Sequence, residues 1–323
     1  MTSPEVGPLF GAVLARALDG WWDEAGRPDP YVVHEHGAGP GTLARAVVQA
    51  EARCAPALRW VLVERSAGQR LLHPDHLPHV GAPGVGATWS EPRRGPQVAS
   101  TGARPAGAVH LILANELLDN LPFDLAQRRD DGWDEVRLAD AGDGTWTEVL
   151  APLDPDRASR LERLAPDAAA DARVPLEDAA GGWVAAGLDQ LEPGGHLVVL
   201  DYTATTAELA ARPWEQWVRT YRGHERGGAP WAHPGEQDVT VEVALDQVGL
   251  ASRPPDRLRS QADALRAWGI EALVAEGRER WHGRAGPADL AALRARSRVG
   301  EAEALLDPAG LGGFTVAEWR AGH

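Results

Sequence analysis

The sequence contains no lysine, a single cysteine and few phenylalanine or tyrosine residues. All 32 basic side chains are arginine, and three Phe and three Tyr stand beside 13 Trp, a bias that we attribute to genomic composition rather than to chemistry. Because Cys54 is the only cysteine, an intrachain disulfide and a cysteine-based zinc site are excluded. The scarcity of cysteine also favours the cytosol.

Long apolar runs and an excess of positive charge are missing as well. No stretch approaches the ~18 apolar residues of a membrane helix, and residues 1–19 lack the basic start and apolar block of a signal peptide. We therefore expect a cytoplasmic protein without membrane insertion. The formal net charge of −15 disfavours a nucleic-acid partner, because binding a phosphate backbone requires a basic face. The oligomeric state stays unknown.

Short apolar strands alternate with helical stretches along most of the chain, which is typical of a parallel sheet with helices on both faces. Asp-Gly turns separate a further group of short strands, which predicts a small antiparallel insertion. The expected parallel strands are residues 31–35, 60–64, 86–89, 109–114 and 196–201, the antiparallel ones 125–129, 135–138 and 145–150, and the later strands 253–258 and 314–319. The expected helices are residues 9–22, 42–52, 66–72, 156–164, 176–191 and 240–248, and residues 261–306 are expected to be mostly helical.

The strongest local signal is a glycine-rich turn between the first strand and its helix. It has the sequence Glu35-His36-Gly37-Ala38-Gly39-Pro40-Gly41-Thr42. Glycines at such a turn let the backbone approach a ligand closely, and the helix that follows offers unpaired N–H groups. The third glycine comes one residue earlier than in the dinucleotide fingerprint.

Two carboxylates flank this loop. Glu35 lies on the strand two residues before the first glycine, Gly37, and Glu64 ends the next strand 23 residues after Gly41, close to the spacing at which an acid meets ribose hydroxyls. Two negative charges repel a pyrophosphate but suit a ligand that carries an ammonium and a sulfonium group. S-adenosylmethionine has both groups and no phosphate, so it is the predicted cofactor. Dinucleotide binding and a purely structural turn are the alternatives.

A second polar motif, Asn115-Glu116-Leu117-Leu118-Asp119-Asn120-Leu121-Pro122, follows the fourth strand. Because the carboxyl ends of parallel strands face the ligand crevice, Asn115 and Glu116 are expected beside the cofactor. In a helix that begins here, Glu116 and Asp119 share a face and are able to hold a guanidinium or an amine. Alternatively Asn115 caps that helix and both acids favour its positive end. The two interpretations are compatible.

Taken together, these motifs resemble the MidA-like family of S-adenosylmethionine-dependent methyltransferases. The mitochondrial member of that family helps to assemble respiratory complex I by dimethylating an arginine of one subunit. The similarity runs nearly from end to end. The segments that carry it are Thr2 to Gly11, Glu35 to Leu43, Leu62 to Ser66, Trp89, Ala114 to Pro122, Trp133 to Glu135, Asp201-Tyr202, His224, Pro234-Gly235, Asp238 to Thr240 and Asp307 to Gly312.

The resemblance implies an α/β fold with a class I methyltransferase (Rossmann-like) sheet of seven strands, the last of them antiparallel. We expect a single domain over residues 1–323, with an antiparallel insertion and a helical cap. The expected core is residues 31–122 and 193–259 plus 313–320, the insertion is residues 123–192 and the cap is residues 260–308.

For the cofactor, Gly37, Gly39 and Gly41 are expected to shape the loop for the methionine moiety, and Glu64 to bind the ribose. Ser90 or Glu91 is expected near the adenine. The full set of expected cofactor residues is Glu35, Gly37, Gly39, Gly41, Thr42, Glu64, Ser66, Ser90, Asn115 and Glu116. No metal is expected, because Pro74 and Pro78 interrupt any shared helical face of His73, His76 and His79.

The resemblance further implies a protein arginine as the methyl acceptor, and hence a protein partner. Glu116 is the first candidate to orient the guanidinium and to take a proton, Asp119 and Glu135 are the next, and His224 and Asp238 are expected to line the acceptor channel. The family's Phe-Phe is Leu117-Leu118 here, which leaves the acceptor open. A small-molecule methyltransferase and a non-catalytic assembly or binding protein with a degenerate cofactor site are the alternative functions.

Overall fold

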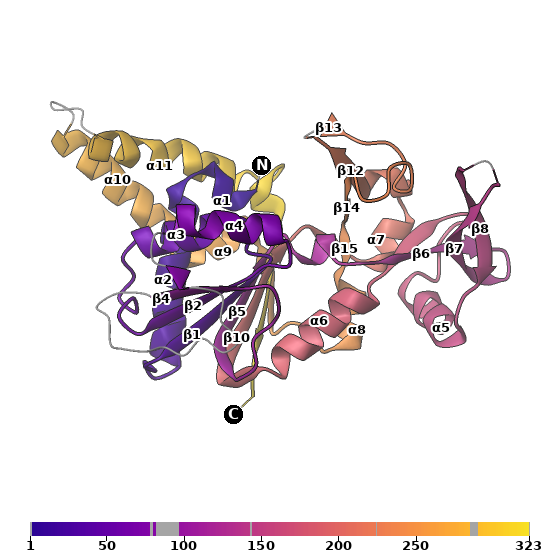
Figure 1. Ribbon diagram of the computed structural model, residues 1–323, viewed down its shortest axis with the longest axis horizontal. Helices are drawn as coiled ribbons and strands as arrows, with labels where there is room; N and C mark the ends of the chain where they lie inside the picture. Colours follow the sequence, from indigo (N-terminus) through magenta and orange to yellow (C-terminus); the bar gives the residue numbers. More distant parts are fainter. Residues whose placement is uncertain are drawn as a thin grey trace. The chain divides into compact units, whose positions relative to one another are not determined.

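The computed structural model describes residues 2–77, 80–81, 97–142, 144–223, 225–284 and 290–322. The chain folds into two compact units, which are described separately below. The first unit comprises Met1–Glu116, Gly187–Leu200 and Pro255–His323, and the second comprises Leu117–Ala186 and Asp201–Pro254 (Figure 1). The expected strand at residues 86–89 lies outside the described residues.

The first unit is built on a mixed sheet whose strands have the order β16-β17-β10-β5-β1-β2-β4-β3. The pairs from β10 to β3 are parallel, and β16 and β17 are antiparallel. The strands are β1 (Tyr31–His36), β2 (Leu58–Val63), β3 (Val80–Gly81), β4 (Gln97–Thr101), β5 (Val109–Asn115), β10 (Leu191–Asp201), β16 (Arg257–Ser260) and β17 (Thr315–Arg320). The predicted class I α/β fold is confirmed. Two of the eight strands, β3 and β4, were not among the expected ones, and β4 lies where the glycine, proline, arginine and serine content of residues 91–108 predicted an irregular connection.

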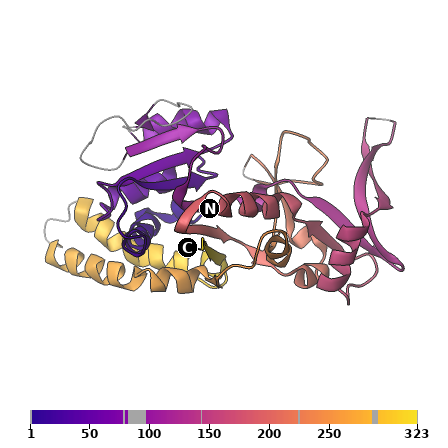
Figure 2. The same cartoon turned by 90° about the horizontal axis from the view of Figure 1, so that it is seen from below.

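One face of this sheet is covered by helices that bury the main hydrophobic core. Apolar residues at helical spacing, among them Leu14 and Leu18, pack against Val33 and Trp60 of the sheet. In Figure 2, α10 and α11 lie side by side, in agreement with their contacts. The helices that contribute to this core are α2 (Pro8–Glu24), α3 (Thr42–Gln49), α9 (Gln261–Ala267), α10 (Ile270–Arg284) and α11 (Leu290–Leu306). The short helix α1 (Ser3–Val6) contacts α2, and α4 (Ala67–His76) contacts β4.

The C-terminal end of α6 (Asp178–Leu188) packs against side chains of β5 and β10 at Gly187. A Cβ atom on Gly187 would lie 2.9 Å from Leu197 Cδ1 and 3.7 Å from Ile112 Cδ1. Only a glycine allows the helix to come this close without a shift of Leu197.

The second unit contains an antiparallel sheet with the strand order β8-β7-β6-β9. Its strands are β6 (Asp124–Arg129), β7 (Gly132–Asp140), β8 (Trp146–Pro152) and β9 (Arg173–Leu176). One face is apolar and packs against α5 (Pro155–Leu164), with Trp133 and Val174 next to Leu161. The remaining elements are η1 (Leu118–Asn120), β11 (Thr203–Ala204), α7 (Thr206–Ala210), η2 (Trp214–Gln216), β12 (Val218–Arg222), β13 (Glu225–Arg226), β14 (Asp238–Val241), β15 (Val243–Ala244) and α8 (Leu245–Ala251).

Two local predictions were wrong. The helix expected at residues 240–248 begins only at Leu245, because the preceding residues form β14, whose alternating side chains pair with β12. The helix expected after Asn115 is a single 3₁₀ turn, η1, because Glu116 takes a left-handed conformation with φ 52°. The structure also groups residues 201–254 with the expected insertion rather than with the core.

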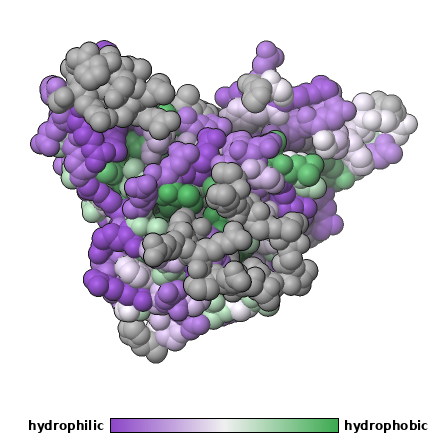
Figure 3. Space-filling model, turned by 60° about the vertical axis from the view of Figure 1, so that its left-hand side comes forward, coloured by the Kyte–Doolittle hydropathy of each residue, from purple (hydrophilic) through white to green (hydrophobic). Residues whose placement is uncertain are grey.

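On the face that Figure 3 presents, polar and charged residues predominate and the hydrophobic areas are small. None of the helices in the described ranges combines the length and the apolar character needed to cross a membrane.

Candidate functional site

The carboxyl ends of three neighbouring strands bring the predicted cofactor residues of the first unit together. His36 of β1 pairs with Val63 of β2 on one side and with Ala114 of β5 on the other. The residues that follow, Gly37, Glu64 and Asn115, therefore lie next to one another at one edge of the sheet. This is the edge at which open parallel sheets bind ligands.

The loop between β1 and α3 depends on its glycines. Gly37, Gly39 and Gly41 have φ values of 68°, 53° and 83°, a left-handed region that favours glycine. Gly41 caps α3, which begins at Thr42. A Cβ atom on Gly39 would meet no atom within 4 Å, so a side chain there would extend into the space above the loop.

The carboxylate of Glu64 is fixed against this loop by backbone amides. Its Oε2 accepts a hydrogen bond from Gly39 N at 2.9 Å, and its Oε1 accepts one from Ser66 N at 2.7 Å. The Ser66 hydroxyl in turn caps α4 by accepting from Gln69 N at 3.3 Å. Glu64 is half-buried, so a carboxylate of defined orientation faces the loop. Ser66 contributes through its amide and its helix cap.

His73 also holds the loop, a contact that the sequence did not predict. Its Nε2 lies 2.8 Å from the carbonyl oxygen of Gly39, and its Nδ1 lies 2.8 Å from Ser100 Oγ. A carbonyl only accepts, so Nε2 carries the proton and donates to Gly39. The ring is fully buried. The peptide units around Gly39 are thus tied at the N–H by Glu64 and at the C=O by His73. The position of His73 on the helix after the ribose-binding motif was its only signal.

Glu35 has a different environment from the one predicted. It is 4% exposed, and its Oε2 accepts a hydrogen bond from Trp60 Nε1 at 2.8 Å. Burial raises the pKa of this carboxyl to about 8, against an ordinary value of 4.5, with the Trp60 hydrogen bond acting in the opposite direction. The expectation of two charged carboxylates facing the loop is therefore corrected to one, Glu64.

Asn115 and Glu116 lie at the end of β5, on the other side of the strand edge from Glu64. Asn115 Nδ2 donates to Glu116 Oε1 at 3.1 Å, while Asn115 Oδ1 is buried and accepts no hydrogen bond within the described residues. Glu116 Oε1 also accepts from Ser3 N at 3.4 Å. The left-handed backbone of Glu116 is uncommon for a residue with a side chain and is typical of functional sites.

The prediction that Glu116 and Asp119 share a helical face was wrong, as was the alternative that Asn115 caps that helix, because no α-helix forms here. Asp119 belongs to the second unit, in the turn η1. Its carboxylate is 2% exposed, accepts a hydrogen bond from the Tyr202 hydroxyl and accepts another from Asn120 Nδ2 at 2.7 Å. Burial raises the pKa of Asp119.

The Asp201 carboxylate stabilises the turn η1. Its Oδ2 accepts from Leu118 N at 2.9 Å and from Asp119 N at 3.4 Å, and its Oδ1 accepts from Tyr202 N at 3.0 Å. Burial and the nearby Asp119 carboxylate raise its pKa well above the ordinary value. The Asp201 carboxylate therefore fixes the turn, and the buried environment that it shares with Asp119 raises the pKa of both carboxyls.

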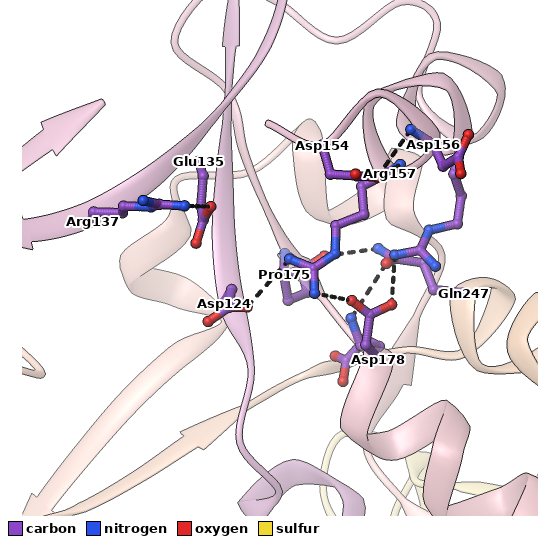
Figure 4. Close-up of polar contacts among 11 residues, drawn as sticks. Asp124, Glu135, Arg137, Asp154, Asp156, Arg157, Pro175, Asp178 and Gln247 are labelled. Atoms are coloured by element: carbon purple, nitrogen blue, oxygen red, sulfur yellow. Dashed lines mark hydrogen bonds and ion pairs between the residues drawn. The ribbon is translucent and has the colours of Figure 1, made fainter. Parts of the chain in front are cut away.

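The other residues predicted to bind the methyl acceptor do not form one cluster with Asp119 and Asp201. Glu135 lies on β7 and forms an ion pair with Arg137 at 2.7 Å, as Figure 4 shows. In the same view, Arg157 pairs with Asp178 at 2.7 Å and Asp154 caps α5, so this region is a structural network. Asp238 is exposed and begins β14, a strand that contacts η1. Ser90 and His224 lie outside the described residues.

The strand edge of the first unit has hydrogen-bond acceptors that suit an adenosyl amino acid. The Glu64 carboxylate is able to accept hydrogen bonds from hydroxyl groups, and Asn115 Oδ1, which has no partner within the described residues, is able to accept one from an ammonium group. The glycines between them leave room for close backbone contact. Within the described ranges, no group of three or more His, Cys, Asp or Glu side chains is arranged to hold a metal ion.

Comparison with known proteins agrees with this geometry. Residues 13–259 match the family model of S-adenosyl-L-methionine-dependent methyltransferases. Over 157 residues the chain is 31% identical to the protein arginine methyltransferase NDUFAF7 homolog, mitochondrial, of Drosophila melanogaster. That match covers 43% of this chain and 34% of the fly protein, so it spans about a third of the relative's length.

Two solved structures from Burkholderia thailandensis are similar over almost the whole chain. One, bound to S-adenosyl-homocysteine, has a TM-score of 0.77 and 26% identity and is matched over 98% of this chain and 77% of its own. The other, a native crystal structure from the same superfamily, has a TM-score of 0.80 and 25% identity, with 99% and 81% covered. The family match covers well over half of the sequence, and the chain therefore belongs to this family of S-adenosyl-L-methionine-dependent methyltransferases.

Proposed function

We propose that the protein transfers a methyl group from S-adenosylmethionine to an arginine side chain of a protein. The name of the fly relative supports a protein arginine as acceptor. The structural observation that carries the proposal is Glu116, a carboxylate held at a strained backbone position beside the unpartnered Asn115 Oδ1. A carboxylate at the cofactor edge suits a guanidinium acceptor, because it offers charge-assisted hydrogen bonds.

In this proposal each residue of the strand edge has one task. Glu64 binds the ribose hydroxyls, and Asn115 Oδ1 accepts from the ammonium group. Gly37, Gly39 and Gly41 let the backbone follow the methionine moiety. When bound, the cofactor supplies a methyl group on a sulfonium that is open to in-line displacement. The protein's contribution is then to orient the acceptor against that methyl group and to exclude water.

Glu116 orients the acceptor guanidinium and takes the proton that the nitrogen loses on methylation. Its backbone is well placed for this, because Glu116 N donates to Leu200 O at 2.8 Å and the side chain is bonded to both Asn115 and Ser3. These contacts hold the carboxylate in one orientation before the acceptor arrives.

The direct test supplies the protein with S-adenosylmethionine labelled in its methyl group. A cell extract is separated into its proteins and its small molecules, and each fraction is incubated with the enzyme. We expect label in the proteins, and acid hydrolysis should release it as methylated arginine. Glu116→Gln should lower the rate of transfer by about 100-fold or more, the range for loss of a general base, while S-adenosyl-homocysteine still binds.

Two results would contradict the arginine proposal and would point to different functions. Label confined to the small-molecule fraction would indicate a small-molecule methyltransferase. Label in neither fraction, although S-adenosyl-homocysteine binds, would favour a non-catalytic binding protein. Glu135→Gln is the matched control, since Glu135 is paired with Arg137 in the second unit and its loss should change the rate little.

A further inference from the structure

The outer edge of the second unit's antiparallel sheet is an apolar strand. β8 stands at the end of the order β8-β7-β6-β9, and no other described strand pairs with its outer side. In an antiparallel ladder, part of the backbone N–H and C=O groups of such a strand point away from its partner. An edge of this kind is a template for an added strand.

Large apolar side chains are exposed beside this edge. Leu138, Trp146 and Leu150 are 46%, 48% and 38% exposed. The register pairs Leu138 with Glu148, Asp140 with Trp146 and Val136 with Leu150, so the three apolar residues lie on one face of the β7–β8 hairpin. Soluble proteins seldom expose such a cluster without an interaction that covers it.

The charge around the β7–β8 hairpin indicates which kind of strand binds at its edge. Residues 130–152 carry seven acidic side chains and one arginine, a formal charge of −6. Two copies of this edge placed side by side would bring these charges together, so self-pairing is disfavoured. A cationic strand at this edge is attracted instead, because acidic side chains flank it.

The acid within the edge strand itself is already neutralised. Glu148 accepts two hydrogen bonds from the guanidinium of Arg173, at 2.9 and 2.6 Å. The centre of the edge therefore carries little net charge, and other acidic side chains lie around it, for example Asp140 opposite Trp146. This distribution matches an extended segment that alternates cationic and apolar side chains.

We propose that β8 is a docking edge that binds an extended, cationic segment of a partner protein as a fifth strand of this sheet. The main-chain hydrogen bonds supply affinity, while Leu138, Trp146 and Leu150 contact the apolar side chains of the segment. The acids of residues 130–152 select for positive charge. The inference concerns binding alone and holds whether or not the partner is methylated.

The test uses two synthetic peptides of about nine residues, the length of a strand. One alternates Arg and Val, and the other alternates Glu and Val. The Arg-Val peptide should bind the full chain at least about tenfold more tightly, and its binding should weaken as salt screens the charges. Hydrogen exchange should slow in residues 146–152 when it binds.

A paired variant localises the binding. Leu138→Thr combined with Trp146→Thr keeps residues that favour strands but removes the apolar contacts, and should weaken the Arg-Val peptide by about tenfold. Leu258→Thr is the matched control, because Leu258 is 56% exposed on β16 of the first unit. Equal binding of both peptides, no binding of either, or a dimer in light scattering that the double variant dissociates would overturn the proposal. Retained S-adenosyl-homocysteine binding shows that a negative result does not reflect an unfolded protein.

Discussion

The two compact units place the carboxylates of the predicted site in opposite settings. In the first unit, Glu64 is half-buried and both its oxygens face backbone amides of the glycine loop and the next helix. In the second, Asp119 is 2% exposed and is bonded to Tyr202 and Asn120. The amides at the strand edge hold the Glu64 carboxylate in an orientation that suits a ligand. The Asp119 carboxylate, buried near a second acid, has a structural role instead.

The same contrast occurs within the first unit, between the two acids that flank the loop. Glu35 lies within β1, opposite Leu62 of β2, and its side chain is buried against Trp60. Glu64 lies just beyond the end of β2, where the alternation of side chains across a strand no longer fixes its direction. The predictions below test whether this distinction between ligand-facing and structural acids is correct.

The largest effect is expected at Gly39. Gly39→Val places a β-branched residue at φ 53° and fills the open space above the loop, so S-adenosyl-homocysteine affinity should fall by about 100-fold or more. Gly26→Val is the control, because Gly26 also has a positive φ of 80° and open surroundings. Calorimetric titration of both variants is the measurement. A similar loss in the two would show that backbone strain, not the loop, was responsible.

Removal of the ligand-facing acid should have the next largest effect. Glu64→Ala loses a charge-assisted contact to the ribose and releases the amides of Gly39 and Ser66, so the affinity should fall by about tenfold to 100-fold. Asp119→Asn should leave the affinity almost unchanged, because the Asp119 carboxylate is bound to Tyr202 and Asn120. Titration of both variants with S-adenosyl-homocysteine is the measurement. Equal losses of affinity would contradict the distinction between ligand-facing and structural acids.

His73 should act on cofactor binding only through the loop. His73→Ala frees the carbonyl of Gly39 and should raise the Kd for S-adenosyl-homocysteine by about tenfold, roughly the value of one buried hydrogen bond. His73→Gln restores a donor and should recover part of the affinity. Ser100→Ala removes only the outer partner and should have a smaller effect. An unchanged Kd in His73→Ala, with the variant folded, would contradict this positioning role.

The smallest effect concerns stability and pH. The pKa of Glu35 is raised by burial to about 8 in the folded protein, so its contribution is fully present below the ordinary value of 4.5 and is lost as the pH rises through 8. Glu35→Gln keeps an acceptor for Trp60 but does not titrate. The free energy of unfolding, measured by denaturant titration, should therefore decline less between these pH values than in the wild type.

Glu177→Gln is the comparison from the second unit. Burial raises the pKa of Glu177 to about 7, so its contribution should be lost at a lower pH than that of Glu35. If neither variant changed the pH dependence, the buried acids would not retain their protons in the folded state.

The parallel core could be predicted because its signals are local. Apolar strands bounded by glycines, and a glycine loop before Thr42, fix both the sheet and the edge at which Gly37, Glu64 and Asn115 meet. The chain order of the strands does not show which side chains turn inward, and so Glu35 was assigned to the ligand side. Nor does it show that His73 reaches across to Gly39, because that contact depends on how α4 packs.

The second unit was harder to predict because its contacts join distant segments. A helix after Asn115 agreed with local propensity, but Asp201 binds the amides of Leu118 and Asp119 and stabilises a 3₁₀ turn instead. Likewise, the strand at Asp238 forms because β12 pairs with it, a partner that periodicity in one segment does not reveal.

The most direct test of the account is a crystal structure of this protein with S-adenosyl-homocysteine. We predict that the ligand lies along the carboxyl edge of β1, β2 and β5, with its ribose hydroxyls donating to Glu64, its ammonium donating to Asn115 Oδ1 and Glu35 still hydrogen-bonded to Trp60. A ligand bound elsewhere, or one bound at this edge with Glu64 turned away and Glu35 drawn out of the core, would contradict it.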